Sequence, residues 1–461
     1  MTLIKSISGI RGTIGGAPGE GLSPIDTVKF SAAYGTWLQR RHNARNLTVV
    51  IGRDARISGP IVNSLVVGTL RSLGIKVLDA GLSTTPTVEM AVGFEKAHGG
   101  IILTASHNPK EWNALKLLNE KGEFISGVEG AEVLRIADAE EFDFAHVDKL
   151  GKLKKIDTAL EQHIQAILKL PYVDTESIKK ANFRIVVDAV NSSGGIAVPM
   201  LLGSLGVENV TCIHCEPTGE FAHNPEPLPA HLTDLSETIL SEKADLGITV
   251  DPDVDRLAMV CEDGTMFGEE YTLVAVADYV LSQKGGSTVS NLSSTRALRD
   301  VTEKHGHQYF ASAVGEVNVV EKMKSVNAVI GGEGNGGVIL PELHYGRDAL
   351  VGIAIFLSQL AKTGKKISEL RDSYPKYTIS KNKIQLTPEI NVDNVLLEMA
   401  KRYSQNEVDS SDGVKIYFEK EWVHLRKSNT EPIIRIYSES QNETQANSLA
   451  EKIMNEIKGI I

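Results

Sequence analysis

The sequence predicts an α/β protein with three related, mixed α/β domains and a smaller α+β domain at the C-terminal end. Two observations lead to this prediction. At 461 residues, the chain exceeds the roughly 250–300 residues that one hydrophobic core usually serves. The same strand–turn–helix–strand pattern also occurs three times, and such alternation is typical of largely parallel sheets covered by helices.

The three copies of this pattern share an apolar strand, a polar turn, a helix that ends in glycine and a second strand. They run from 47 to 78, from 184 to 212 and from 287 to 311, with Gly74, Gly206 and Gly306 at the helix ends. This internal repeat predicts three similar domains.

The C-terminal part follows another pattern. It predicts a helix over 391–403, a hairpin of 414–418 and 421–425, a strand over 433–437 and an amphipathic helix over 444–458. Polar or charged stretches then set the expected domain boundaries. The four predicted domains are 1–150, 151–257, 258–372 and 373–461.

Composition and charge exclude several classes of protein. A net charge of −11 argues against non-specific nucleic-acid binding. The longest apolar run, 349–357, is far shorter than the ~18 residues of a membrane-spanning helix, and residues 1–6 lack the apolar core of a signal peptide. Three cysteines give no disulfide framework. We therefore expect a cytoplasmic protein that binds neither membrane nor nucleic acid. Its oligomeric state stays open between a monomer and a homodimer.

One cysteine-containing segment could suggest a metal site. Cys212-Ile213-His214-Cys215 lies in a strand-like run, and the sequence shows no second pair of ligands for it. We interpret these residues as core and edge positions rather than as a zinc site.

A polar turn after a buried strand carries the first candidate site. The apolar run 101–103 leads into Thr104-Ala105-Ser106-His107-Asn108-Pro109. Strand ends of this kind display reactive side chains in α/β enzymes. Given a metal ion and a proton acceptor, Ser106 could carry a phosphoryl group. A plain turn before proline is the alternative.

Three carboxylates at alternating positions form the second candidate. Asp251, Asp253 and Asp255 follow the strand-like run 244–250. Oxygen ligands that converge on one hard cation favour Mg²⁺, with water or substrate phosphate in the remaining positions. Like charges so close together would repel one another without a cation, which disfavours a solvated acidic turn.

The third candidate is the glycine-rich segment Gly332-Glu333-Gly334-Asn335-Gly336-Gly337. It fits the pattern G-x-G-x-x-G, but Pro341 would break the helix that a dinucleotide-binding loop requires, and no acidic residue lies near position 357. A flexible loop with one carboxylate and one amide suits hydrogen bonding to a polyol instead.

The fourth candidate, at 426–435, combines two guanidinium groups, two hydroxyls and an amide. Such a set fits a phosphate dianion. Its residues are Arg426, Ser428, Asn429, Thr430 and Arg435.

Taken in this order, the four segments resemble the motifs of the α-D-phosphohexomutases, and the similarity runs from Gly9-Ile10-Arg11-Gly12 to the C-terminal end. The family includes phosphoglucomutases, phosphomannomutases and phosphoglucosamine mutases. The resemblance implies an enzyme that moves phosphate between O6 and O1 of a hexose through a phosphoserine and a bisphosphorylated sugar. It also implies four domains around a central cleft, with one loop of each domain meeting there.

The resemblance further assigns roles to residues. Ser106 carries the phosphate, and Mg²⁺ lies between it and the three aspartates; a sugar 1,6-bisphosphate serves as activator. Arg11, His107 and Lys116 surround the phosphoserine, with His107 and Lys116 as candidates for proton transfer. Arg256, Glu333 and Asn335 contact the sugar phosphate, and the segment from Arg426 to Arg435 binds the phosphate that is not transferred.

Departures from the family pattern bear on the substrate. Many members have serine and histidine where this chain has Asn335 and Gly337. Val314-Gly315-Glu316 and the segment at 9–12 resemble the phosphoglucosamine and archaeal-type members more than the bacterial phosphomannomutase type. Ser428-Asn429-Thr430 resembles the phosphomannomutase/phosphoglucomutase group instead. Glucosamine phosphate is slightly favoured over glucose or mannose phosphate.

Two other functions are weighed against a mutase. A non-catalytic sugar-phosphate-binding relative would be expected to have lost Ser106 or one of the three aspartates, and all four are present. A phosphatase would release phosphate and need no bisphosphate.

Overall fold

The computed structural model of the protein describes residues 2–6, 9–387, 390–427 and 433–460. The chain forms two compact units, one of residues 1–272 and 336–368 and the other of residues 273–335 and 369–461. It passes from one unit to the other within α9 (Glu269–Gln283), between positions 335 and 336, and again within α13 (Ile367–Asp372).

The first unit begins with a seven-stranded mixed sheet in the order β1-β2-β6-β5-β3-β4-β7. Its centre is parallel, because β3 pairs in parallel with both β4 and β5, whereas β6 runs antiparallel to β5 and β2. The strands are β1 (Ile4–Ser6), β2 (Gly9–Thr13), β3 (Thr48–Arg53), β4 (Lys76–Leu82), β5 (Gly99–Leu103), β6 (Trp112–Leu118) and β7 (Leu153–Lys155).

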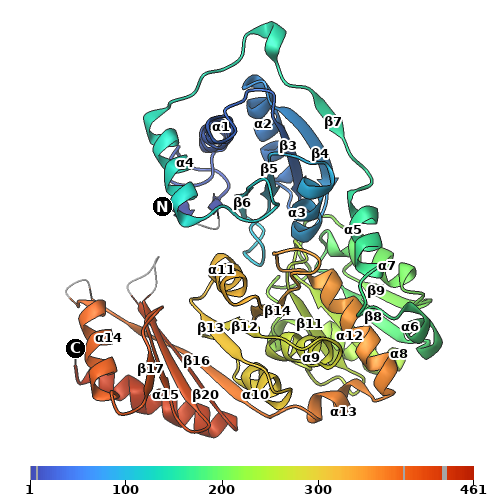
Figure 1. Cartoon of the computed structure of the whole chain (residues 1–461), viewed down its shortest axis with the longest axis vertical. Coiled ribbons are helices and arrows are strands. Elements are labelled where there is room, and N and C mark those ends of the chain that lie inside the picture. The colour runs from blue at the N-terminus through green and yellow to red at the C-terminus, as the bar shows by residue number, and fades with distance from the viewer. Residues whose placement is uncertain (1, 7–8, 388–389, 428–432, 461) are drawn as a thin grey trace. The chain divides into compact units, whose positions relative to one another are not determined.

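Helices cover both faces of this sheet (Figure 1). Helices α1 (Pro24–Arg41), α2 (Gly59–Ser72) and α4 (Gly127–Ala139) pack on one face, and α3 (Thr85–Phe94) packs on the other. Burial on both faces explains the uninterrupted apolar sequence of β5, which is buried along its whole length.

A second sheet of the same unit has the order β11-β10-β8-β9, with β8 parallel to both β9 and β10. The carboxyl ends of β8, β9 and β10 therefore lie at one edge. The strands are β8 (Arg184–Asp188), β9 (Asn209–Ile213), β10 (Leu246–Val250) and β11 (Leu257–Cys261). The other elements of this unit are α5 (Ala159–Leu168), α6 (Thr175–Ala181), α7 (Gly194–Ser204), α8 (Thr233–Glu242), α12 (Ala349–Thr363), β15 (Gly337–Ile339), and the 3₁₀ turns η1 (Val147–Lys149) and η2 (Pro229–His231).

In the second unit, β12 lies between β13 and β14 and is parallel to both. The elements of this part are β12 (Thr288–Asn291), β13 (Tyr309–Ser312), β14 (Ile330–Glu333), α10 (Ala297–Lys304) and α11 (Glu316–Val326). The strand–helix–strand units expected at 184–212 and 287–311 are both present.

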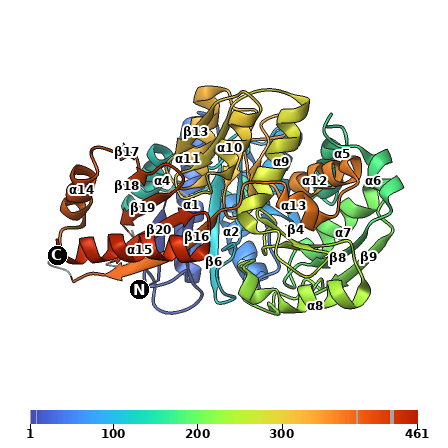
Figure 2. The ribbon, with the colours of Figure 1, turned by 90° about the horizontal axis from the view of Figure 1, so that it is seen from below.

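The C-terminal part of the second unit is an antiparallel five-stranded sheet in the order β16-β20-β19-β18-β17. Helices α14 (Val392–Arg402) and α15 (Glu443–Lys458) pack apolar side chains against one of its faces, and α15 runs alongside β16 (Figure 2). The strands are β16 (Thr378–Gln385), β17 (Glu407–Asp409), β18 (Val414–Tyr417), β19 (Trp422–Lys427) and β20 (Ile433–Ser440).

The predicted fold class is confirmed: α/β domains are followed by a smaller α+β domain. Of the C-terminal elements, the sequence did not predict β16 and β17. Along the part of the chain that the structure describes, no helix is both long and apolar enough to cross a membrane.

Candidate active site

Ser106 lies in the turn that follows β5, held between two other side chains. Its backbone N–H donates to Thr104 Oγ1 at 2.9 Å, and its Oγ donates to Asp251 Oδ2 at 2.8 Å. The φ angle of Ser106 is +50°, in the left-handed region that non-glycine residues seldom occupy. Such backbone strain is often found at functional sites and persists only where neighbouring contacts enforce it.

Arg56 supplies many of those contacts. Its side chain is completely buried, and its guanidinium donates to the backbone carbonyls of Ser106 at 2.5 Å and Asn108 at 2.7 Å. It also donates to the carbonyls of Pro109 and Trp112 and to Asp54 Oδ2, with distances of 2.6 to 3.0 Å. One arginine thus fixes the backbone of the whole serine turn, a role that the sequence did not predict.

The three aspartates follow β10 on a loop that is also held firmly. Val254, between the second and third aspartates, has a φ of +61°, which is unusual for a β-branched residue. The carbonyl of Pro252 accepts hydrogen bonds from the hydroxyls of Ser192 at 2.8 Å and Ser193 at 2.7 Å. The carbonyl of Asp253 accepts one from the backbone N–H of Thr85, at the start of α3.

Each aspartate has a different set of partners. Asp251 Oδ1 accepts the backbone N–H groups of Asp255 and Arg256, both at 3.1 Å. Asp253 Oδ2 accepts the Thr85 hydroxyl at 2.6 Å and the Lys116 ammonium at 2.7 Å.

The third aspartate faces two cations. Asp255 Oδ2 accepts Arg347 Nη2 at 2.7 Å and lies 3.5 Å from Lys116 Nζ. Burial opposes ionisation of Asp255, but Arg347 and Lys116 outweigh it and lower its pKa below the usual range. Arg347 is a second residue of this site that the sequence did not predict.

The electrostatics of the triad suit a cation. Burial and the negative charges of Asp255 and Asp253 raise the pKa of Asp251 well above its usual value. Oδ1 of Asp253 and Oδ1 of Asp255 are buried, and no residue in the described ranges donates a hydrogen bond to them. One carboxylate oxygen of each residue lies within 4.8 Å of the others. The residues therefore fit a hard metal ion, which would relieve the repulsion and occupy the remaining lone pairs.

An imidazole and an arginine lie near the serine turn on its other sides. His107 Nδ1 lies 3.4 Å from Ser106 Oγ, and Arg11 on β2 reaches the Asn108 side chain at 3.5 Å. Burial and the charge of Arg256 are the main reasons that the pKa of His107 falls to about 2. Burial and the charges of Arg256 and Arg347 also lower the pKa of Arg11. Arg11, Arg256 and Arg347 thus lie close enough to one another for their charges to interact, and such a set of guanidinium groups suits a phosphate dianion.

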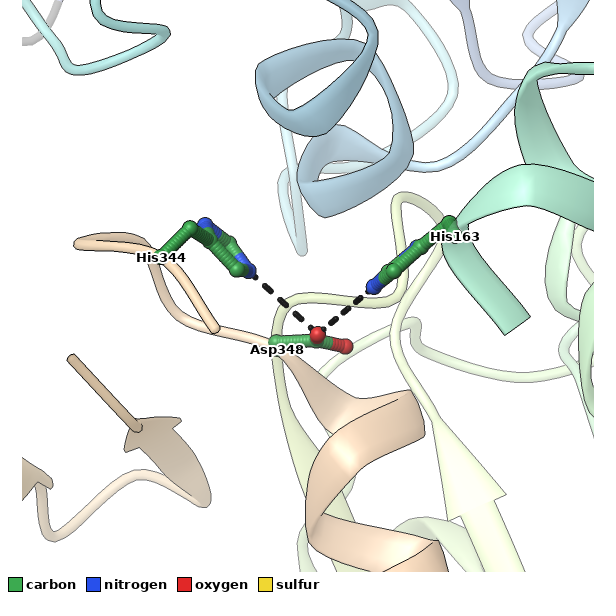
Figure 3. A group of neighbouring side chains, drawn as sticks. All are labelled: His163, His344 and Asp348. Carbon is green, nitrogen blue, oxygen red and sulfur yellow. Dashed lines mark hydrogen bonds and ion pairs between the residues drawn. The ribbon is translucent and has the colours of Figure 1, made fainter. Parts of the chain in front are cut away.

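The residue that follows Arg347 belongs to a histidine–carboxylate cluster of His163, His344 and Asp348 (Figure 3). The next residue, Asp348, accepts His163 Nε2 at 2.9 Å and His344 Nε2 at 3.3 Å on the same oxygen. Its other oxygen caps α12 by accepting two backbone N–H groups. His344 Nδ1 lies 3.3 Å from Glu89 on α3. Because Asp348 is so constrained, the backbone that carries Arg347 is fixed as well.

In the second unit, Glu333 ends β14 and is almost completely buried. Its Oε1 accepts Asn291 Nδ2 at 2.7 Å and the backbone N–H of Gly315 at 3.1 Å. The following loop is fixed where the N–H of Gly334 donates to Ser294 Oγ at 2.9 Å. Asn335 lies on this loop, one residue beyond Gly334, so the predicted pair of polar residues does share one loop.

Arg426 and Arg435 face each other directly across β19 and β20. Lys383 on β16 lies opposite Arg435 on its other side. Like charges at directly opposite positions destabilise a sheet in the absence of an anion. Arg426 Nε is 2.9 Å from Asp412 Oδ2. Ser428, Asn429 and Thr430, also predicted to bind phosphate, lie outside the described residues.

The structure thus brings together Ser106, His107, Lys116, Arg11, Arg256 and the three aspartates in the first unit. Lys383, like Arg56 and Arg347, was missed. The signal for Arg56 was present in the polar turn Arg53-Asp54-Ala55-Arg56, directly after a strand. The sequence could not single out Lys383, because its position opposite Arg435 depends on how β16 pairs with β20. The sequence of one strand does not show that pairing.

Comparisons with known proteins extend over nearly the whole chain. Residues 3–144, 161–264 and 268–377 match the alpha/beta/alpha domains I, II and III of phosphoglucomutase/phosphomannomutase, and residues 384–456 match its C-terminal domain. A phosphoglucomutase/phosphomannomutase from Thermococcus kodakarensis is 36% identical over 445 residues, covering 95% of this chain and 96% of that protein. A phosphoglucosamine/phosphogalactosamine mutase from Sulfurisphaera tokodaii is 32% identical over 467 residues, covering 100% and 99%.

The fold is shared with a crystal structure of a phosphoglucomutase/phosphomannomutase family protein from Burkholderia thailandensis. The TM-score is 0.86 at 24% identity, and the match covers 99% of this chain and 98% of that chain.

Proposed function

This chain belongs to the phosphoglucomutase/phosphomannomutase family of phosphohexomutases, and we propose that Ser106 is the residue that carries the transferred phosphoryl group. The observation that carries this assignment is the position of its Oγ, 2.8 Å from Asp251 and 3.4 Å from His107. A nucleophile with a proton acceptor and an acidic cation-binding triad beside it is the arrangement that phosphoryl transfer requires.

In the proposed reaction, the free hydroxyl of a hexose monophosphate attacks the phosphorus of phospho-Ser106. The bond between phosphorus and Oγ breaks, and the hydroxyl proton passes through His107 to Oγ. A hexose bisphosphate and a neutral serine result. After the bisphosphate has turned end over end, the reverse step returns its other phosphoryl group to Ser106 and releases the isomeric monophosphate. His107 lies within reach of Ser106 Oγ, whereas Lys116 is already bound to Asp253. Because burial and Arg256 lower the pKa of His107 to about 2, its ring would hold the proton only transiently between the two oxygens.

Asp251, Asp253 and Asp255 would hold the metal ion, and Mg²⁺ is the best match to three carboxylates. When bound, Mg²⁺ supplies positive charge to the oxygens of the transferring group. Lys116, Arg347, Arg256 and Arg11 add fixed positive charge around the same position. A sugar 1,6-bisphosphate would activate the enzyme by phosphorylating Ser106.

The phosphate that is not transferred would bind to Arg426 and Arg435, which lie opposite each other on adjacent strands, together with Ser428, Asn429 and Thr430. Two guanidiniums on adjacent strands can hold one phosphate with several charge-assisted hydrogen bonds. The direct pairing of Arg426 with Arg435 supports this role, because an anion removes their repulsion.

For the substrate, we favour glucosamine phosphate over glucose or mannose phosphate. Glu333 is held as a buried acceptor by Asn291 and Gly315, and Asn335 adds an amide on the same loop. A 2-amino group gains a charge interaction with such a carboxylate that a 2-hydroxyl lacks. The two relatives differ in this respect, since one is named for glucose and mannose and the other for amino sugars.

The carrier is tested with Ser106→Ala, and Ser83→Ala, at the same 8% exposure, is the matched control. Turnover with a sugar bisphosphate present should fall at least ~10³-fold in Ser106→Ala. The intact mass of the wild type and of the control, after incubation with the bisphosphate, should include one phosphate that Ser106→Ala lacks. Full activity of Ser106→Ala would refute the assignment, and net release of phosphate by the wild type would favour a phosphatase.

The substrate is tested by kcat/KM on glucosamine, glucose and mannose 6-phosphates under one activator. We expect the highest value for glucosamine 6-phosphate. A tenfold preference for glucose or mannose 6-phosphate, about 1.4 kcal/mol in transition-state binding, would overturn the substrate assignment and leave the mutase assignment intact.

A further inference from the structure

A second histidine–carboxylate cluster lies at the edge of the β8–β9–β10 sheet. Asp188 ends β8, His214 directly follows β9, and His223 comes from the loop after it. His214 Nδ1 is 3.1 Å and His223 Nε2 is 3.0 Å from the same oxygen, Oδ2 of Asp188. Asp188 is completely buried, whereas the side chains of His214 and His223 remain 22% and 16% exposed. None of these residues belongs to the site proposed above.

Each histidine has a hydrogen-bond partner on the side of its ring that faces away from Asp188, and this partner determines which ring nitrogen can bind a metal ion. His223 Nδ1 lies 2.8 Å from the carbonyl oxygen of Asn224. A carbonyl only accepts, so Nδ1 carries the proton, and the neutral ring presents the lone pair of Nε2 to a carboxylate oxygen that also has only lone pairs. This contact requires a cation or an additional proton between the two atoms.

In His214 the two ring nitrogens exchange these positions. Its Nδ1 faces Asp188, and its outer nitrogen, Nε2, lies 3.5 Å from the Asp234 carboxylate. Histidines that bind metals usually donate their other N–H to a carboxylate or a carbonyl, which orients the ring. Both histidines here have such an outer partner.

We propose that Asp188, His214 and His223 bind a divalent transition-metal ion of the Zn²⁺ type. The ligands would be Asp188 Oδ2, His214 Nδ1 and His223 Nε2, which lie within 4.8 Å of one another. Ligand atoms around a tetrahedral zinc ion are about 3.3 Å apart, so the observed 3.0 and 3.1 Å separations need only a slight expansion. Two imidazoles and one carboxylate suit Zn²⁺ rather than Mg²⁺, which prefers oxygen ligands throughout.

The cluster lies near the surface on the side of His214. A shallow depression lined by His214, Asp234 and Thr238 opens to the surface beside the cluster. The partial exposure of His214 and His223 would allow water to complete the coordination of a bound ion. The sequence analysis assigned His214 to a strand-like run and not to a zinc site. The proposed ligands Asp188 and His223 lie in separate segments, and Cys212 and Cys215 are not among the ligands.

The ion would fasten the loop over 215–228 to the sheet, and this loop reaches the serine turn. Phe221 lies against the Arg56 guanidinium, with 5.1 Å between the guanidinium carbon and the ring centre. Gly219 packs so tightly on Ala55 that an added Cβ would be 2.1 Å from its carbonyl oxygen. Glu226 lies 3.8 Å from Arg256. The metal site would thus brace residues beside the active site without touching the substrate.

The test is calorimetric titration of Zn²⁺ into metal-free full-length protein, with Mg²⁺ saturating so that the aspartate triad is occupied. We expect one Zn²⁺ per chain, and at least tenfold weaker binding in His214→Gln and in His223→Gln. Asp234→Asn should lose about tenfold through the outer hydrogen bond. The control is His305→Gln, which removes a histidine of equal 22% exposure that pairs with Asp278 at 2.8 Å.

Unchanged Zn²⁺ affinity in both glutamine variants, or no binding to the wild type, would overturn the proposal. If a variant does not fold, Co²⁺ added to the Mg²⁺-saturated wild type gives an independent measurement. Visible absorption of Co²⁺ bound to imidazole is expected, and its absence would also overturn the site. Hydrogen exchange of the backbone over 215–228 should slow when Zn²⁺ is added. Unaltered exchange would refute the bracing role.

Discussion

At the scale of single residues, the aspartate triad shows how a site can be built against stability. Asp251, Asp253 and Asp255 are completely buried, yet Lys116 and Arg347 contact only the last two. The raised pKa of Asp251 means that its ionised form is disfavoured in the folded protein. A bound cation removes this penalty, so ion binding and folding stability are coupled.

We therefore expect Asp251→Asn to have opposite effects on activity and on stability. An asparagine can accept the backbone N–H groups of Asp255 and Arg256 with Oδ1 and donate to Ser106 Oγ with Nδ2. At neutral pH the metal-free variant should unfold at the same or a higher temperature than the wild type, because the repulsion is gone. Its Mg²⁺ affinity should fall at least ~10-fold and its turnover should fall with it.

The control for this experiment is Asp263→Asn, which changes an exposed carboxylate bonded to Thr265 in the next turn. The activity of Asp263→Asn should depend on Mg²⁺ as the activity of the wild type does. If chelator-treated wild type keeps its rate, or if Asp251→Asn binds Mg²⁺ normally, the metal site is wrong.

Sequence alone could predict the residues of this site that stand in local patterns. Ser106 follows an apolar strand, and the three aspartates alternate along a single loop. Arg56 and Arg347 could not be assigned in the same way, because their partners are 50 and 92 positions away in the sequence. The polar turn after β3 marks Arg56 as a candidate, but its role in holding backbone carbonyls leaves no periodic signal, so the fold is needed to assign that role.

At the scale of elements, the strands with apolar alternation were predictable and the polar ones were not. The sequence predicts a strand over 433–437, where Ile433, Ile434 and Ile436 are buried in β20. Its neighbour β16 has the sequence Thr-Ile-Ser-Lys-Asn-Lys-Ile-Gln, which is polar at most positions and is held by pairing with β20. Tertiary pairing overrides the weak local preference of such a strand.

The paired strands β19 and β20 lead to a prediction about phosphate binding. Arg426→Ala should raise KM for the sugar phosphate by roughly 2–4 kcal/mol in binding, since it removes charge-assisted hydrogen bonds. Lys427→Ala is the matched control, because successive residues of a strand point to opposite faces and Lys427 pairs with Asp393. Steady-state kinetics over a range of substrate concentrations measure both. Equal KM values for the two variants would exclude this clamp.

At the scale of the whole molecule, buried side chains join segments that match separate family domains. Within the first unit, one buried network links three of them. Glu89 lies in the segment matched to domain I, His163 in domain II, and His344 and Asp348 in domain III. His163 also contacts the hydroxyl of Thr87 on α3 at 3.0 Å. The sequence predicted the fold class but not this junction, whose members are isolated residues in otherwise ordinary helices and turns.

The junction predicts how stability depends on pH. Burial alone would lower the pKa of His344, but hydrogen bonds and charges from Asp348 and Glu89 raise it to about 10. The unfolded chain has a histidine pKa of about 6.5, so between these values the folded protein binds more protons than the unfolded one. The contribution of His344 is therefore complete below pH ~6.5 and is lost as the pH rises towards 10.

Thermal unfolding of the wild type and of His344→Gln, measured from pH 6.5 to pH 10, tests this junction. At pH 6.5 the wild type should be more stable than His344→Gln by about 3–5 kcal/mol. The wild type should lose this advantage as the pH rises to 10, so the unfolding temperatures of the two proteins should converge. His305→Gln, at a pair outside the network, should follow the wild type at every pH. A constant difference between the wild type and His344→Gln would mean that His344 contributes by packing and not by its charge. In that case, the charged junction would not be what holds the three segments together.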